Sequence, residues 1–171
     1  MKITTIFATI LFVFSMGFTC FGQLKMRKDK KGSLEFFAHE TGLLTHKTKA
    51  MQCAVDAMGS TGFNIDSKQV SSALIGTATQ AVSIEGDKDL GTITFEFVFG
   101  FRSGFVIFGF NHFKYKTENT TFKSLGKLPY VYEGKVKKTF TEAQYELLKT
   151  RINNQVSAIM DAIIQNCSKQ N

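Results

Sequence analysis

A phenylalanine-rich stretch near the middle of the chain, FEFVFGFRSGFVIFGFNHF at residues 95–113, constrains the fold more than any other feature. It holds eight phenylalanines in nineteen residues, with one Arg-Ser-Gly turn between two apolar runs. This pattern predicts a β-hairpin, in which neighbouring residues of each strand point to opposite faces of the sheet. A two-residue loop brings to one face Phe95, Phe97, Phe99, Phe101, Val106, Phe108 and Phe110. We predict that this face is buried in the core.

The opposite face of the predicted hairpin is mixed in character. A contiguous group of exposed apolar side chains marks a surface that binds a ligand or a partner. The candidate binding residues on this face are Val98, Ile107, Asn111, Phe113 and Tyr115. The assignment assumes regular pairing, because a bulge or a three-residue loop would exchange the faces. A membrane ribbon is not favoured, since residues 105–110 are apolar on both faces and do not alternate.

The C-terminal segment has the clearest helical pattern. Thr141 and Gln144 have the spacing of a capping box, and Phe140 with Tyr145 has the spacing of a hydrophobic staple. An apolar stripe at steps of three and four then consists of Tyr145, Leu148, Ile152, Val156, Ile159, Ile163 and Cys167. The flanking positions are mostly neutral and do not supply the charges of a coiled coil. We therefore predict that this helix packs on the protein's own sheet.

Shorter segments complete the predicted order of elements. SLEFFAHETG is typical of a strand that ends at a glycine turn. HKTKAMQCAVDAMGSTG has an apolar stripe on one side of a helix and places Cys53 on the far side. QVSSALIGTATQAVSI contains two strands or one bent strand. The prediction is an α+β fold, in which a strand, a helix, four strands and a long helix form an antiparallel sheet packed against the C-terminal helix.

The first residues of the chain predict export. MKITTIFATILFVFSMGFTCFGQ has one lysine, an apolar run and then small residues, which are the three parts of a secretory signal peptide. We expect residues 1–22 to be a signal peptide cut after Gly22, and the mature protein to be periplasmic, on the outer surface or secreted. A retained anchor and a lipoprotein acylated at Cys20 are the alternatives. The mature part is predicted to have a basic tail, residues 23–32, and one domain, residues 33–168.

Charge and cysteine content narrow the partners and the compartment. The formal net charge is +7, and residues 24–32, LKMRKDKKG, hold five cationic side chains beside one aspartate. A solvated tail that keeps the chain soluble is the favoured interpretation, and a tail that touches anionic surfaces is the alternative. We expect no nucleic acid, which an exported protein seldom meets. Cys53 and Cys167 remain after the predicted cut. Two cysteines in an oxidising compartment form either a disulfide or two free thiols, and the even count suggests the disulfide.

The assembled pattern resembles a family of exported bacterial proteins that share a domain of unknown function with a TATA-binding-protein-like (TBP-like) fold. The matching segments are SLEFFAHETG, KAMQCAVDAM, SSALIGTAT, TITFEFVF with GFVIFGFNHFKYK, and the closing helix. The resemblance covers most of residues 33–167 and implies a TBP-like β-α-β4-α topology. The strand FVIFGFNHF departs from it, being more apolar than the basic, polar strand expected. The family has no assigned activity, so the resemblance implies no functional residue.

The sequence lacks the motifs of common catalytic and metal sites. His39, His46 and His112 are far apart, and none has metal-ligand spacing with Cys, Asp or Glu. No nucleophile elbow, phosphate-binding loop or dinucleotide-binding fingerprint occurs. We therefore predict a protein that is not an enzyme and has no catalytic residue, metal or cofactor.

Two non-enzymatic functions fit these observations. The first is an exported binding module, which holds an apolar ligand between sheet and helix or meets a protein partner through the outer sheet face. The second is an envelope-associated structural protein that oligomerises through its sheet. A motif-free enzyme is a third alternative.

Overall fold

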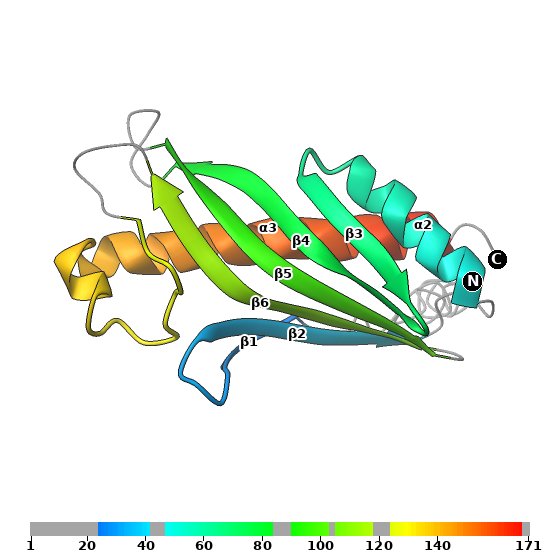
Figure 1. Ribbon diagram of the computed structural model, residues 1–171, viewed down its shortest axis with the longest axis horizontal. Helices are drawn as coiled ribbons and strands as arrows, with labels where there is room; N and C mark the ends of the chain where they lie inside the picture. The colour runs from blue at the N-terminus through cyan, green and yellow to red at the C-terminus, as the bar shows by residue number, and fades with distance from the viewer. Residues whose placement is uncertain (1–23, 42–46, 84–89, 103–104, 118–123, 169–171) are drawn as a thin grey trace, which may run out of the picture.

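A computed structural model describes residues 24–41, 47–83, 90–102, 105–117 and 124–168. Within these residues, a six-stranded antiparallel sheet lies in front of the long C-terminal helix, and a shorter helix lies beside one edge of the sheet (Figure 1). The strand order across the sheet is β1-β2-β6-β5-β4-β3. The elements are β1 (Lys25–Lys28), β2 (Leu34–Thr41), α2 (Lys47–Gly59), β3 (Asn64–Val70), β4 (Ala73–Ser83), β5 (Leu90–Arg102), β6 (Phe105–Thr117), η2 (Val136–Lys138) and α3 (Glu142–Ser168). The predicted order of elements from β2 to α3 is confirmed.

The β5–β6 hairpin occupies the middle of the sheet and carries the predicted core face. Arg102 pairs with Phe105, which confirms the two-residue connection. All seven residues of the predicted core face are buried. The ring of Phe99 meets Phe108 and Phe110 edge to face, with centroids 5.3 Å and 5.4 Å apart. Aromatic pairs of this geometry each add about 0.5–1.5 kcal/mol to the energy of burial.

Helix α3 covers this inner face of the sheet. Its capping box is confirmed, because the Thr141 N–H donates to Gln144 Oε1 at 2.8 Å and the Gln144 N–H donates to Thr141 Oγ1 at 3.3 Å. Every residue of the predicted apolar stripe, from Tyr145 to Cys167, is buried. The helix runs behind the sheet for most of the sheet's width (Figure 1). In the described part of the chain, no helix combines the length and the apolarity needed to cross a membrane.

A β-bulge interrupts the pairing of β5 with β6. Thr94 pairs with Lys114, and Glu96 pairs with Asn111. Phe95 alone on β5 therefore lies opposite two residues on β6, residues 112 and 113. One extra residue in a strand reverses which positions face the core beyond it, because side chains alternate between the two faces.

The bulge overturns part of the predicted outer face. His112 takes a left-handed φ of 54° at the bulge. Beyond it, Phe113 and Tyr115 point toward the helices and are each 1% exposed. The prediction that these two residues belong to the outer face is wrong, because regular alternation was assumed through a position where the strand gains a residue.

The segment predicted to be a basic tail contains a strand. β1 pairs antiparallel with β2, with Lys25 opposite Phe37. The Asp29 carboxylate holds the turn that follows, accepting hydrogen bonds from the N–H groups of Lys31 and Ser33, both at 2.7 Å. The sheet thus begins at Lys25, ahead of the predicted domain start, because β1 satisfies backbone groups on the free edge of β2.

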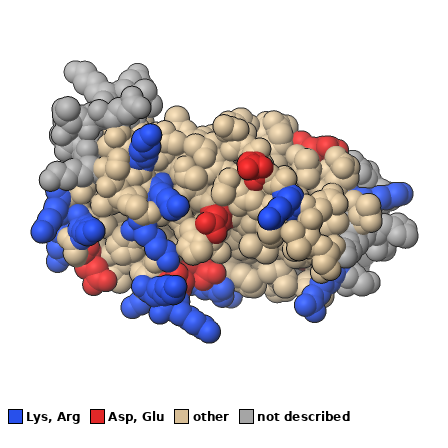
Figure 2. All heavy atoms as spheres, in the orientation of Figure 1, with Lys and Arg blue, Asp and Glu red and all other residues tan. Residues whose placement is uncertain are grey.

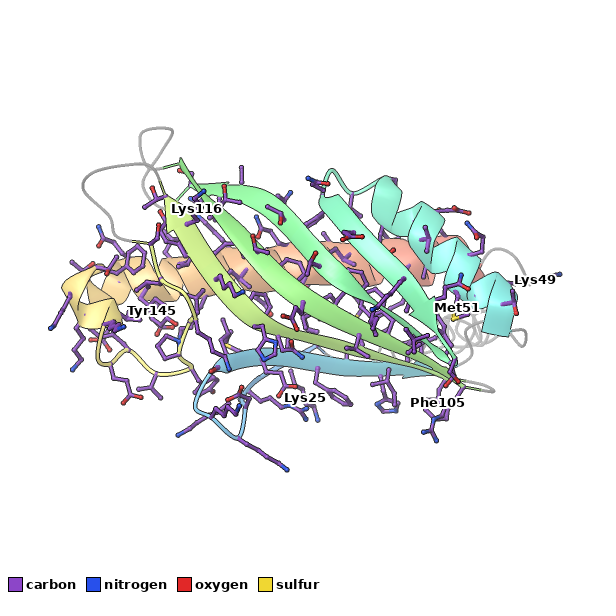
Figure 3. The ribbon with its side chains drawn as sticks, in the orientation of Figure 1. Lys25, Lys49, Met51, Phe105, Lys116 and Tyr145 are labelled. Carbon is purple, nitrogen blue, oxygen red and sulfur yellow. A yellow bond between two sulfur atoms is a disulfide. The ribbon has the colours of Figure 1, made fainter. Side chains whose placement is uncertain are left out.

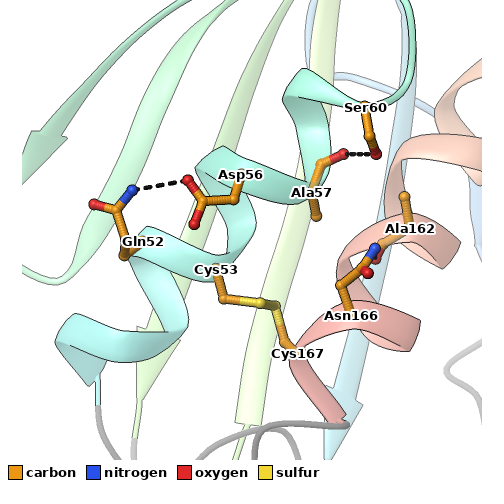
Figure 4. The surroundings of a disulfide bond; sticks show 8 residues. All are labelled: Gln52, Cys53, Asp56, Ala57, Ser60, Ala162, Asn166 and Cys167. Atoms are coloured by element: carbon orange, nitrogen blue, oxygen red, sulfur yellow. Dashed lines mark hydrogen bonds between the residues drawn. A yellow bond between two sulfur atoms is a disulfide. The ribbon is translucent and has the colours of Figure 1, made fainter.

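A disulfide between Cys53 and Cys167 joins α2 to α3, with Cα atoms 5.7 Å apart (Figure 4). Cys53 is 3% exposed, so the prediction that it lies on the outer side of its helix is wrong. Ala50, Ala54 and Ala57 are buried as well. Because these side chains are small, α2 packs closely against its neighbours and buries a wider face than the single apolar stripe indicated.

The connection between β6 and α3 is anchored at several points. The Leu128 N–H donates to the Phe113 carbonyl at 2.9 Å, and the Tyr132 hydroxyl donates to the Phe140 carbonyl at 2.6 Å. The Tyr145 hydroxyl, at the start of α3 (Figure 3), donates to the carbonyl of Pro129. Burial, with the nearby Glu146 charge, raises the pKa of Tyr145 well above its ordinary value. The predicted signal peptide, residues 1–22, and His46 lie outside the described residues.

Candidate functional site on the outer face of the sheet

The outer face of the sheet, turned away from the helices, carries two neighbouring rows of mainly apolar residues. Register places Phe37 beside Gly109, Gly109 beside Val98, and Val98 beside Ile75, so the first row crosses β2, β6, β5 and β4. The second row, one step along the strands, consists of His39, Ile107, Gly100, Ala73 and Val70. These residues come from separate parts of the chain, and pairing alone brings them together.

Two glycines leave the middle of these rows open. A Cβ atom added at Gly109 would lie 3.5 Å from the carbonyl oxygen of Val98, and one added at Gly100 would lie 3.8 Å from Cβ of Ile107. These are ordinary contacts, and neither glycine has the left-handed φ that would exclude other residues. Neither the backbone nor a close neighbour requires glycine here. Its effect is to expose the floor of the sheet between Val98 and Ile107.

Two hollows meet at Val98, a residue that is 42% exposed. The β3-side hollow has a volume of about 360 Å³ and is lined by Asp66, Ser67, Lys68, Ile75, Gly76, Thr77, Glu96, Phe97 and Val98. The central hollow has a volume of about 340 Å³ and is lined by Arg27, Glu35, Phe37, Ser72, Ala73, Val98, Gly100, Arg102, Ile107, Gly109 and Asn111. Each lies in the range of small-molecule sites, roughly 300–1,000 Å³.

Charged side chains stand at the rims of these hollows. Arg27 Nε lies 3.1 Å from Glu35 Oε2, and its guanidinium lies 4.5 Å from the centre of the Phe37 ring. At the β3-side hollow, Glu96 Oε2 lies 2.7 Å from His112 Nδ1. An apolar floor with a charged rim is the usual arrangement of a binding surface.

Three of the five predicted binding residues lie together. Val98, Ile107 and Asn111 line the central hollow, whereas Phe113 and Tyr115 lie in the core on the opposite face. The Oδ1 atom of Asn111 is buried and has no hydrogen-bond partner among the described residues.

Sequence reasoning missed the residues that other strands bring to the site. Phe37 is one of them, and strand alternation in SLEFFAHETG was a usable signal, since Phe36 is buried and Phe37 is half-buried. Gly100 and Gly109 were also missed as floor residues. Their place on the same face as Val98 and Ile107 was the only signal, and it gains meaning once β2 and β4 are known to lie on either side.

A third hollow, the hairpin hollow, adjoins the central hollow at the β1–β2 turn. It has a volume of about 520 Å³ and is lined by Arg27, Lys28, Asp29, Lys30, Lys31, Glu35, His112 and Lys127. Lysine and arginine side chains gather in this half of the outer face and are sparser over the other half (Figure 2). Hydrogen bonding, first from the Ser33 N–H, lowers the pKa of Asp29, so its carboxylate stays ionised beside the cations.

The described residues show binding features and no arrangement that points to a reaction. No group of three His, Cys, Asp or Glu within them could hold a metal ion. The side chains of His112 and Glu96 are 47% and 48% exposed, so the contact between them is well solvated. Tyr145, the one described residue with a strongly raised pKa, supports the connection to α3 on the other side of the sheet.

Comparison with solved structures shows the fold. A TBP-like protein from Parabacteroides distasonis is similar with a TM-score of 0.57 and 14% sequence identity, over 81% of this chain and 96% of that chain. A DUF4468 family protein from Bacteroides ovatus is similar with a TM-score of 0.54 and 11% identity, over 81% of this chain and 90% of that chain. No protein-family model and no curated protein matches the sequence. The predicted TBP-like fold, and the resemblance to bacterial proteins of unknown function, are confirmed at the level of fold.

Proposed function

We propose that this protein is a non-enzymatic binding protein, which holds an apolar ligand or an apolar segment of a partner protein on the outer face of its sheet. The observation that carries the proposal is the open floor at Gly100 and Gly109, between Val98 and Ile107. The inner face is already filled by its own phenylalanines and by α3. Binding on the outer face therefore has more support than binding between sheet and helix.

The driving force for such binding is the burial of apolar surface. Val98 is 42% exposed, and Phe37, Ile75 and Ile107 are half-buried in the free protein. Covering these side chains contributes about 25 cal/mol for each Å² of apolar surface removed from water. Charged groups at the rim then select the orientation of the bound molecule. Burying an unpaired charge costs free energy, so the favoured orientation leaves each charged group in water or paired with an opposite charge.

Export belongs to the same proposal. The disulfide between Cys53 and Cys167 is a feature of proteins in oxidising compartments. Together with the signal-peptide pattern of residues 1–22, it supports a protein that acts outside the cytoplasm. The mass of the protein purified from its own cells tests this part, since cleavage after Gly22 leaves a chain that starts at Gln23.

The envelope-associated alternative, in which the outer face pairs with a second copy, is favoured by one observation. Val98 and Val70 are 42% and 46% exposed on this same face. Self-association would bury them without any ligand. Sedimentation at several protein concentrations separates the two functions, because only the alternative predicts that the fraction of dimer rises with protein concentration.

The experiment that tests the binding function fills the open floor. Gly109→Leu places a side chain over the central hollow, and Gly126→Leu makes the same change at an exposed position with no neighbouring atom. Binding of the neutral apolar dye Nile red is measured by fluorescence on the full chain. We expect Gly109→Leu to weaken binding about tenfold, the loss of roughly 1.4 kcal/mol. We expect Gly126→Leu to match the wild type.

Circular dichroism of each variant checks that the fold is retained. The proposal fails if the wild-type chain does not bind the dye, or if Gly109→Leu and Gly126→Leu bind it equally well. A native mass spectrum of the purified wild-type protein gives the mass of a bound ligand, which is seen as an adduct that is lost on denaturation.

A further inference from the structure

The hairpin hollow and the central hollow share a wall, which is the Arg27–Glu35 ion pair. Resting on the proposed function, we propose that the ligand is a single anionic amphiphile, with its apolar body in the central hollow and a phosphate group in the hairpin hollow. The two hollows are adjacent because Glu35 and Phe37 are alternate residues of β2 and point to the same face. A molecule that crosses this wall passes from apolar floor to cationic surface.

The hairpin hollow has an excess of positive charge that the protein does not neutralise. Five cationic side chains and two carboxylates line it. Both carboxylates are already occupied, Glu35 by Arg27 at 3.1 Å and Asp29 by Lys127 at 3.5 Å. No carboxylate in the described part of the chain forms an ion pair with Lys28, Lys30 or Lys31. These three lysines are therefore available to an anion.

The turn that carries the lysines is held in place. The Asp29 carboxylate accepts the N–H groups of Lys31 and Ser33 at 2.7 Å. The Gly32 carbonyl accepts the Tyr130 N–H at 3.0 Å, which ties the turn to the connection before α3. Gly32 has a left-handed φ of 85°, which glycine adopts without strain. A fixed turn lowers the entropic cost of gathering several cations around one ligand group.

The charge balance favours phosphate over carboxylate. Five cations against two carboxylates leave the hollow with three positive charges. A phosphate monoester carries between one and a half and two negative charges at neutral pH, about twice the charge of a carboxylate, and has three acceptor oxygens. Separate lysines on a turn can contact such a group from several directions, and Arg27 can contribute N–H donors from the wall.

The test compares three probes on the full chain at low ionic strength: decyl phosphate below its micelle concentration, neutral decyl glucoside, and inorganic phosphate. Affinities are measured by isothermal titration calorimetry. We expect decyl phosphate to bind about tenfold more tightly than decyl glucoside, the equivalent of one charge-assisted hydrogen bond. Inorganic phosphate is expected to bind more weakly than decyl phosphate, because it lacks the apolar body.

Two matched variants locate the phosphate group. Lys30→Gln with Lys31→Gln removes two charges from the hairpin hollow, and Lys135→Gln with Lys138→Gln removes two exposed charges elsewhere. The first pair is expected to lower the affinity for decyl phosphate about tenfold and leave decyl glucoside unchanged. The second pair is expected to change neither, apart from a small long-range effect that salt screens.

The outcomes separate this inference from the proposed function. If decyl glucoside binds as tightly as decyl phosphate, the outer-face site stands and the phosphate assignment is overturned. Equal losses in the two double variants overturn it as well, because the effect is then general charge. If the chain sediments with phosphatidylglycerol vesicles but does not bind dispersed decyl phosphate, the lysines serve a membrane surface and the amphiphile is rejected. Absence of binding by both decyl compounds removes the proposed function too.

Discussion

The two faces of the β5–β6 hairpin belong to the same strands but differ in how deeply their side chains are buried. On the inner face, Phe99 has no exposed surface and touches other rings, whereas on the outer face its neighbour Val98 is 42% exposed. Both faces carry apolar side chains. The difference is that α3 covers one face and nothing in the described chain covers the other in the same way. Apolar residues under a helix stabilise the fold, and those without cover form the surface that we propose binds a ligand.

The largest expected effect comes from comparing substitutions at two adjacent residues that face opposite sides of the sheet. Phe99→Ala should lower the free energy of unfolding by about 3–5 kcal/mol, because it opens a cavity among packed rings. Val98→Ala should change it by less than about 1 kcal/mol, since its side chain is partly in water. Urea unfolding of both variants measures the difference. Similar losses in the two would mean that the outer face is as much a core as the inner one.

Next in size is the link that holds the helical layer on the inner face. Cys53→Ser with Cys167→Ser should lower the free energy of unfolding by about 2–4 kcal/mol, because the disulfide closes a long loop and restricts the unfolded chain. Urea unfolding is the measurement, with and without a reductant. The reductant should destabilise the wild type and leave the double variant unchanged. If the free energy of unfolding of the wild type does not change when the disulfide is fully reduced, this role is contradicted.

Glycines on the two faces of the sheet offer a third comparison. Gly91 lies under the ring of Tyr115 on the inner face, so an added Cβ collides with that ring. Gly91→Ala should therefore lower stability by about 1–3 kcal/mol. Gly109→Ala on the outer face should instead raise stability by up to about 1 kcal/mol, because alanine restricts the unfolded chain and fits the open floor. Thermal unfolding shows the sign of each change, and equal signs would refute the assignment of faces.

The smallest effect concerns the bulge that exchanges the faces of β6. His112 has a left-handed φ, which costs an L-residue roughly 1–2 kcal/mol. His112→Gly should therefore be more stable than His112→Val by about that amount, because valine is β-branched. Differential scanning calorimetry measures both. Glu96→Gln serves as a control for the lost contact between His112 and Glu96, which should contribute less than about 1 kcal/mol at this exposure. Equal stability of the two His112 variants would argue against the bulge.

Local periodicity accounts for the parts that were predicted correctly. The helix α3, its capping box and the inner face from Phe95 to Phe110 each depend on spacings within a few residues. Such spacings act through side chains that meet inside one element, so the pattern is visible before any partner is known. Three residues of the candidate site, Val98, Ile107 and Asn111, were found in this way.

What the sequence determined by itself is the chemistry of each segment: one amphipathic helix, one aromatic hairpin, a basic stretch and two cysteines available to pair. The tertiary structure alone decided that the basic stretch forms β1, that the bulge at His112 turns Phe113 and Tyr115 inward, and that Phe37 and Ile75 join the hairpin's outer face. The physical reason is that strand pairing joins residues far apart in the chain. One extra residue in a strand reverses which side chains face the core beyond it. No local sequence pattern indicates which strand a segment will pair with.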